Sequence, residues 1–485
     1  MKRTKRFPLF NRPALATAGS ALLASYAATV GGQGLPSVPG LTELQQPVAT
    51  TLQNVCIKLN GLDGGPVLAP PDPNGTPAQR LSDSCSKMVV SAFNNQGATG
   101  TPPQFSLNIS NEQLATGVQA IAPVQANAQK QISTEASKMN GIGARLLTVR
   151  GGARGIVLGL NGQNVQVAGA SPPARAGLDG ATGGGAAADD VLGGKLGGFV
   201  NVAYSWGNVD QTTLQDAYKY GSFSILAGAD YRVSDSVVIG GAISYSDTHS
   251  DYEQSLGDVK AATTGVIGYG TWYKDDWYVD GFLAYGNVDY DSTRNINIPS
   301  NNPAAKAIVT SATSNPKGEQ WSASIGVGKS FTSGTFIITP TARLGYIHVK
   351  NKAFSENEPN NGLALAVSAR TVKSLQSALG ARFSTTVNTS TAVFVPYFNA
   401  QWLHEFENDS SSIVAKYVAG PAPGPTFDPF FAIPTASPTR DYAFLAIGTA
   451  ATLPDNFSAF AQFSAAVGLQ NETNYSVVLG LRKQF

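Results

Sequence analysis

The residues that most often carry catalysis or bind metals are few and scattered in this chain. Its three histidines are His249, His348 and His404, and none precedes residue 249. A Ser-His-Asp triad therefore cannot be assembled within the N-terminal half, and a histidine-based metal site has too few ligands. The sequence contains neither a Gly-x-Ser-x-Gly elbow nor a Gly-Asp-Ser-Leu block. These features predict that the protein is not an enzyme and uses no metal or cofactor.

The two cysteines form the only other pair with obvious chemistry. Cys56 and Cys85 stand 29 positions apart and are the only cysteines in the chain. In an oxidising compartment an even pair predicts a disulfide, which stabilises a fold by closing a loop of this size. Two free buried thiols are the alternative. Residues 64–73, between the cysteines, are rich in Gly and Pro and predict turns.

The N-terminus carries the features of an export signal. Lys2, Arg3, Lys5 and Arg6 precede an apolar stretch over 13–30 that ends among small residues, which predicts a signal peptide over 1–30. An N-terminal membrane anchor is the alternative interpretation. Charged residues are only 13% of the chain, with Lys+Arg 33 against Asp+Glu 32. That balance argues against nucleic-acid binding, which needs a concentrated basic face.

From residue 196 onward, apolar and small or polar residues alternate with a period of two, as in strands with two different faces. Leu196, Val200, Val202, Tyr204 and Trp206 share one face of the first such segment. Twelve segments follow this pattern, at 196–207, 221–231, 236–246, 262–273, 277–288, 318–331, 335–348, 372–384, 391–404, 442–452, 457–468 and 474–485. The pattern predicts a twelve-stranded antiparallel sheet.

The connections between these segments alternate in length. Short turns follow the even-numbered segments, and longer loops follow segments three, five, seven and nine, including 289–317, 349–371 and 405–441. Short periplasmic turns opposite long outer loops are typical of a bacterial outer-membrane barrel, although period two alone also fits a soluble sandwich. Aromatic residues near segment ends favour the membrane barrel, because they predict interfacial girdles. They are Tyr204, Trp206, Trp272, Tyr273, Trp277, Tyr278 and Trp321.

The last segment resembles the C-terminal assembly signal of bacterial outer-membrane proteins. Tyr475, Val477, Leu479, Leu481 and Phe485 fall on one face, which only Lys483 interrupts. The resemblance implies that the barrel-assembly machinery and periplasmic chaperones recognise these side chains. Packing against outer-membrane lipid is the simpler interpretation, and both can hold.

Three stretches resemble strands of autotransporter β-domains. They are Ser374-Leu-Gln-Ser-Ala-Leu-Gly-Ala-Arg-Phe-Ser384, the stretch 395–406 that follows it, and 276–286 with Arg294 shortly after. The resemblance covers roughly 194–485. It implies a type V secretion translocator of the Gram-negative outer membrane, which carries its own N-terminal passenger to the cell surface.

The region ahead of the barrel predicts a short passenger over 31–154, partly helical and partly irregular. Ser110 and Gln113 form a potential capping box for a helix from Asn111, which Pro123 should kink or interrupt. A second short helix is expected over 142–154. Arg145, Arg150 and Arg154 in this stretch could contact acidic groups in the lumen, or could form a solvated face. Residues 155–194 are rich in Gly and Ala and predict a flexible linker, followed by the barrel over 195–485.

These features predict an outer-membrane autotransporter barrel with an attached, non-enzymatic passenger and an unknown surface ligand. A porin-like or plugged channel and a surface adhesin remain the alternative functions.

Overall fold

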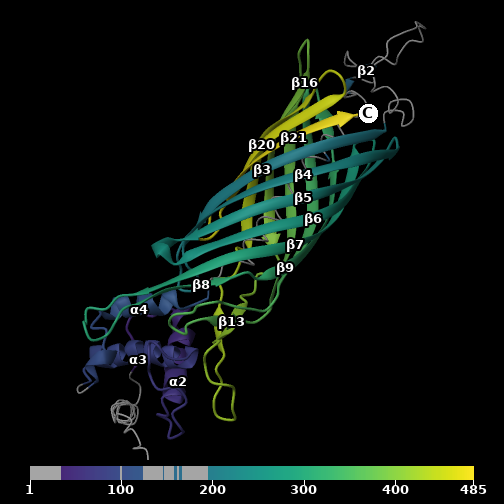
Figure 1. Ribbon diagram of the computed structural model, residues 1–485. Coiled ribbons are helices and arrows are strands. Elements are labelled where there is room, and N and C mark those ends of the chain that lie inside the picture. The colour runs from purple at the N-terminus through teal and green to yellow at the C-terminus, as the bar shows by residue number, and fades with distance from the viewer. Residues whose placement is uncertain (1–33, 99–100, 124–145, 147–157, 161–162, 166–194) are drawn as a thin grey trace, which may run out of the picture.

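The computed structural model describes residues 34–98, 101–123, 146, 158–160, 163–165 and 195–485 (Figure 1). Its main feature is an antiparallel barrel that closes because β21 pairs with β3 along Tyr475↔Trp206 to Gln484↔Gly197. Within the described residues, twelve strands form its wall. They are β3 (Leu196–Val209), β4 (Tyr218–Ser234), β5 (Val237–Tyr252), β6 (Gly257–Lys274), β7 (Trp277–Ile298), β9 (Lys317–Lys329), β11 (Phe336–Asn351), β14 (Arg370–Thr385), β16 (Val393–Glu405), β19 (Asp441–Thr452), β20 (Phe457–Val467) and β21 (Asn474–Gln484).

All twelve predicted strands are confirmed, and their outer surface is apolar. Side chains such as Ile243, Leu283 and Ile447 are 67, 68 and 62% exposed, as expected where lipid rather than protein covers them. The alternating burial in each strand places small and polar side chains on the opposite, inward face. The period of two therefore arises because one face meets lipid and the other meets the lumen.

The prediction of the aromatic girdles was correct for five of its seven residues. Tyr204, Trp206, Trp272, Trp277 and Trp321 lie on the outward face. Tyr273 and Tyr278 face inward, because each is the neighbour in sequence of an outward-facing Trp. Tyr273 accepts a hydrogen bond from Arg232 on that inner side.

The long loops are more regular than predicted. The loop expected after the third segment shrinks to residues 253–256, because β5 and β6 continue past the membrane wall. β7 and β8 (Ile308–Ser314) form an extended hairpin. Residues from the next two loops form a four-stranded sheet in the order β12-β13-β17-β18. These strands, β12 (Phe354–Ser355), β13 (Leu365–Val367), β17 (Ser412–Tyr417) and β18 (Phe431–Pro434), are called the loop sheet below.

Residues 34–98 and 101–123 contain three α-helices, α2 (Gln45–Leu59), α3 (Pro77–Asn95) and α4 (Asn111–Ala120), and the short 3-10 turns η1 (Leu35–Ser37) and η2 (Pro103–Phe105). The capping box predicted for α4 is confirmed, and Ser110 accepts a hydrogen bond from the Gln113 amide. The helix ends at Ala120, three residues before Pro123. The sequence analysis missed α2 and α3, although Thr76 and Gln79 form an equivalent capping box before α3. No described helix has the length and apolarity needed to cross a bilayer.

Several predictions fall wholly or largely outside the described residues. These are the signal peptide over 1–30, the helix over 142–154 with Arg145, Arg150 and Arg154, and most of the linker over 155–194. The described part of the predicted linker is not flexible coil. It forms a two-stranded ladder of β1 (Leu158–Leu160) and β2 (Gln163–Val165).

Candidate functional site: a helical cap on the outer end of the barrel

The three helices lie at the end of the barrel farthest from the C-terminus (Figure 1). Phe485 marks the other end, where its amide donates to the Leu196 carbonyl at 2.9 Å. In outer-membrane barrels the short turns are periplasmic and the long loops extracellular. The helices contact the long loops and therefore lie on the outer side. Residues 34–98 and 101–123 are called the cap below.

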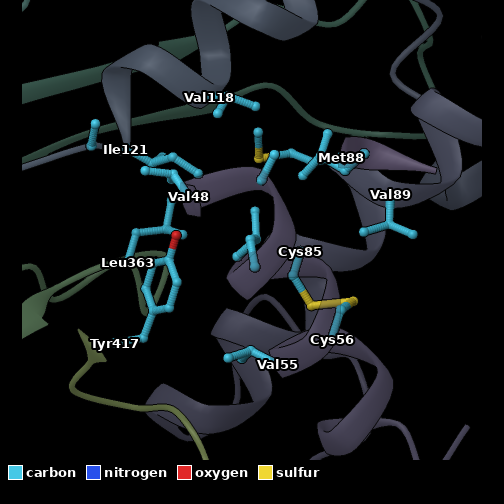
Figure 2. Close-up of a cluster of buried hydrophobic side chains, with 14 of the residues drawn as sticks. Val48, Val55, Cys56, Cys85, Met88, Val89, Val118, Ile121, Leu363 and Tyr417 are labelled. Carbon is cyan, nitrogen blue, oxygen red and sulfur yellow. A yellow bond between two sulfur atoms is a disulfide. The ribbon is translucent and has the colours of Figure 1, made fainter. Parts of the chain in front are cut away.

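The cap and the loops share one hydrophobic core (Figure 2). Val48, Leu114 and Val118 of the cap are fully buried, in one cluster with residues of the β7–β8 hairpin and the loop sheet. The loop residues of this cluster are Ile296, Ile298, Ala305, Ile308, Leu363, Leu365, Val367, Ile413, Ala415, Tyr417, Phe431 and Ile433. Neither part could bury this apolar surface alone, so the cap is bound to the barrel by the same effect that folds a single domain.

Cys56 of α2 and Cys85 of α3 meet inside this core and form a disulfide, with their Cα atoms 5.6 Å apart (Figure 2). The bond joins the two longest helices of the cap across the turn-rich segment 60–75. In the unfolded chain it restricts the ensemble, which stabilises the folded cap. No cysteine is free.

Arg294 of β7 is the charged centre of the contact between cap and barrel. Its side chain is 2% exposed and forms a bidentate pair with Glu356, with Nε donating to Oε1 at 3.0 Å. Nη1 donates to the Ala120 carbonyl at 3.0 Å, and Nη2 donates to the Leu363 carbonyl at 3.0 Å. One guanidinium therefore binds the last turn of α4 and the loop ahead of β13. Its position at a helix C-terminus also suits the helix dipole.

A second buried carboxylate shapes the loop that receives α3. Glu358 accepts from the amides of Asn360, Asn361 and Leu363 at 2.8, 2.9 and 3.0 Å, and from the Thr310 hydroxyl at 2.7 Å. These bonds compensate for burying the charge. They hold Gly362 in the left-handed region, with φ 72°, against the first turn of α3. The Ser84 hydroxyl of α3 donates to the Asn361 carbonyl at 3.0 Å.

A polar chain on the other side of the cap ends at Asp216, in the connection between β3 and β4. Gln45 donates to the Gln119 side-chain carbonyl at 2.7 Å, and Gln119 donates to the Asp216 carboxyl. Asp216 is 7% exposed. Burial raises the pKa of Asp216 to about 7, an effect that the hydrogen bond from Gln119 only partly opposes. The carboxyl therefore titrates near neutral pH while it is covered by the cap.

We expect cap docking to weaken as the pH rises through about 7. The pKa of the docked Asp216 is above its ordinary value, so the docked state binds the proton more tightly. Its contribution is complete below the ordinary pKa of 3.8 and is lost as pH rises through about 7. Asp216→Asn should make the protease resistance of the cap equal at pH 5 and pH 8. An unchanged pH dependence in this variant would assign the titration to another group.

One described residue between the cap and the first barrel strand, Leu146, lies in the lumen. Leu146 is 2% exposed and is buried among inward-facing side chains of five strands. They are Phe199, Ala242, Ile267, Tyr269, Phe282, Ile347 and Val349. Ala120 lies at the outer end of the barrel and Leu196 at the periplasmic end. Leu146 lies between these two residues in the sequence, and its side chain is buried inside the barrel.

A buried ion pair supports the barrel seam on its inner side. Arg482 of the closing strand donates to Asp230 of β4 at 3.1 Å, reaching across β3 at Gly197. A Cβ at Gly197 would lie 2.4 Å from the guanidinium, so glycine leaves room for Arg482 to reach Asp230 without shifting. The pair joins three consecutive strands where the barrel closes.

The remaining predicted site residues lie on the closing strand. Tyr475, Val477, Leu479 and Leu481 share the outward face of β21, and Phe485 follows at the periplasmic end with 40% of its surface exposed.

The side chains that join cap and barrel were missed by the sequence analysis, because Asp216, Glu356, Glu358 and Gly362 all lie in stretches that resemble ordinary loops. Arg294 was noted for its place after a strand, without a role. Among the described residues, no group of His, Cys, Asp and Glu is arranged to hold a metal ion.

The fold thus defines a membrane barrel whose N-terminal helices α2, α3 and α4 lie over its outer mouth. Comparison with known proteins agrees with this class. The autotransporter beta-domain family matches residues 198–464, which is more than half of the chain. The chain belongs to the autotransporter family, and its C-terminal part is an outer-membrane β-barrel.

Individual relatives are more distant. "Lipase 1" of Photorhabdus luminescens is 28% identical over 272 residues, which are 54% of this chain and 38% of that protein. The match thus spans about two fifths of that relative's length. The translocator domain of NalP from Neisseria meningitidis is 15% identical, with a TM-score of 0.46 over 60% of this chain and 88% of that one. The transport unit of AIDA-I from Escherichia coli is 16% identical, with a TM-score of 0.41 over 60% and 90%.

Proposed function

We propose that the barrel translocates its own N-terminal region and then keeps it, uncleaved, as a folded cap on the cell surface. The observation that carries this proposal is the hydrophobic core shared by α2, α3 and α4 with the β7–β8 hairpin and the loop sheet. A core of this kind forms only when the helices are already on the outer side. A signal peptide over 1–30 would deliver the chain to the periplasm first.

The retained passenger acts as a structural part of the protein in this proposal and has no catalytic activity of its own. The chain has no histidine before residue 249, and the buried carboxylates at the outer mouth are engaged in hydrogen bonds that hold the loops. The activity named for the Photorhabdus relative belongs to a protein of which this chain matches 38%. A plugged channel is the second candidate, favoured by the burial of Leu146 in the lumen.

Cleavage of the cap on intact cells tests surface display. A protease site inserted in the exposed turn at 64–73 lies between Cys56 and Cys85. Protease added to intact cells should cut it, and the two fragments should separate only after the disulfide is reduced. A matched site in the periplasmic connection 386–392 should be cut only after lysis. If the cap site also requires lysis, the cap is periplasmic and surface display is wrong.

Deletion of Phe485 tests the proposed recognition by the barrel-assembly machinery. Phe485 is 40% exposed and Phe336, another lipid-facing aromatic at the same end of the barrel, is 66% exposed. Deleting Phe485 should lower the amount of heat-modifiable barrel in the outer membrane, because the assembly signal is lost. Phe336→Ala removes a comparable lipid contact and should change it little. If the two changes lower the amount of assembled barrel equally, the C-terminal residues only pack against lipid and are not an assembly signal.

A further inference from the structure

Three basic side chains gather on the outward face of β11 and β14, at the outer end of the membrane wall. Alternation along β11 places Leu344, Tyr346, His348 and Lys350 on one face, where Leu344 is 46% exposed. Lys373 of β14 stands directly opposite His348 in the sheet register. His348, Lys350 and Lys373 are called the basic patch below. It faces away from the lumen, toward the surrounding membrane.

The height of the basic patch coincides with the outer aromatic girdle. The ring of Trp321 on β9 stacks on His348, with centroids 5.3 Å apart, and lies 4.9 Å from the ring of Tyr346. Aromatic girdles sit where hydrocarbon gives way to lipid headgroups. Lys350 is two residues farther out, or roughly 7 Å along the strand. The basic patch therefore lies at the level of the headgroups of the outer leaflet.

The basic patch differs from the rest of the outer end of the barrel wall in having few carboxylates beside it. Glu319 stands opposite Lys350 in the register, but it forms its ion pair with Lys352 at 2.6 Å, so two lysines share this one carboxylate. Among the described residues, no carboxylate forms an ion pair with His348, Lys350 or Lys373.

At the outer end of the wall, other basic groups on the outward face form ion pairs with acids. His249 pairs with Asp251 at 2.8 Å, Lys317 approaches Asp289 at 3.6 Å, and Lys219 approaches Glu253 at 3.9 Å. The excess of positive charge on the outward face is therefore local to β11 and β14 and does not extend around the whole outer end of the barrel.

We propose that the basic patch binds the phosphate groups of a phosphorylated glycolipid in the outer leaflet of the outer membrane. Ammonium groups form strong, charge-assisted hydrogen bonds to phosphate oxygens, and unpaired cations beside a membrane attract anionic headgroups. Trp321 and Tyr346 contact the apolar part of the same lipid just below. The two ammonium groups, of Lys350 and Lys373, fit a headgroup with two phosphates better than a single phosphodiester, and the ring of His348 adds an N–H donor.

Lipid exchange into the purified full-length protein tests this assignment. The probe is bisphosphorylated lipid A, compared with dephosphorylated lipid A and with phosphatidylglycerol, each counted as bound lipid by native mass spectrometry. The wild type should retain the bisphosphorylated lipid in preference to both others. Lys350→Gln with Lys373→Gln should weaken that retention by about ten- to thirtyfold. Lys317→Gln, which removes a lysine already paired with Asp289 at 3.6 Å, should leave it unchanged.

Arginine replacements at positions 350 and 373 should restore retention, because they keep the charge. Heat-modifiable mobility shows whether each variant has a folded barrel, and the comparison of the three lipids in the wild type needs no variant. Equal retention of lipid A with and without phosphates would overturn the proposal. So would equal retention of phosphatidylglycerol, or a glutamine variant that binds as well as the wild type.

Discussion

Replacing Arg294 with methionine should release the cap from the barrel without unfolding the barrel wall. The substitution leaves the Glu356 carboxylate, which is 5% exposed, without its cation, and it removes the donors to Ala120 and Leu363. Breaking a buried ion pair from one side costs about 3–5 kcal/mol, because the remaining charge stays buried and uncompensated. We expect hydrogen exchange in α4 to accelerate correspondingly, while exchange in β20 and β21 stays slow.

Two further variants identify the cause of that effect. Glu356→Gln added to Arg294→Met should restore part of the protection of α4 against hydrogen exchange, because it removes the buried carboxylate that has lost its cation. The glutamine can still accept the hydrogen bond that the Leu365 amide donates to Glu356 at 2.9 Å. Lys219→Met breaks an exposed pair with Glu253, at 3.9 Å, and exposed pairs contribute only about 0–1 kcal/mol. If Arg294→Met leaves α4 as protected as in the wild type, Arg294 does not hold the cap.

Gly362→Ala should displace α3 from the loop that receives it. An alanine Cβ at this position would lie 2.5 Å from the Pro77 carbonyl oxygen and 2.6 Å from the Leu81 amide nitrogen, both of which are backbone atoms. The left-handed conformation, with φ 72°, adds about 1–2 kcal/mol of strain for alanine, and overpacking adds about 1–3 kcal/mol. We expect faster hydrogen exchange in α3 and faster cleavage of the cap at low protease concentration.

Gly97→Ala separates the clash from the backbone strain. Gly97 also has a left-handed backbone, with φ 89°, but no atom lies within 4 Å of the place that an alanine Cβ would occupy there. Gly97→Ala should destabilise the cap only by the backbone strain, because it leaves the contact between α3 and Gly362 intact. If the two alanine variants destabilise the cap equally, the approach of α3 to Gly362 contributes nothing to docking.

The membrane environment explains why the barrel could be predicted from the sequence. Every strand has one face toward lipid and one toward the lumen, so solvent imposes a local period of two along each strand. Leu481 of the closing strand is 51% exposed, and Val200 of the first strand, its partner in the register, is 46% exposed. The capping box of α4 could be read in the same way, because Ser110 and Gln113 act on the backbone of their own helix turn.

Only the tertiary structure decided where the N-terminal region belongs. Arg294 and Ala120 are 174 positions apart, and Ser84 and Asn361 are 277 apart, so no local pattern relates them. The loop residues resembled solvent-exposed connections, because strands as short as β12 and β13 show too few alternations to be recognised. The sequence by itself therefore determined the alternating strands and the local helix start at α4. Long-range packing decided that the cap and the loops form one core, because burial against distant residues is invisible in a single stretch of sequence.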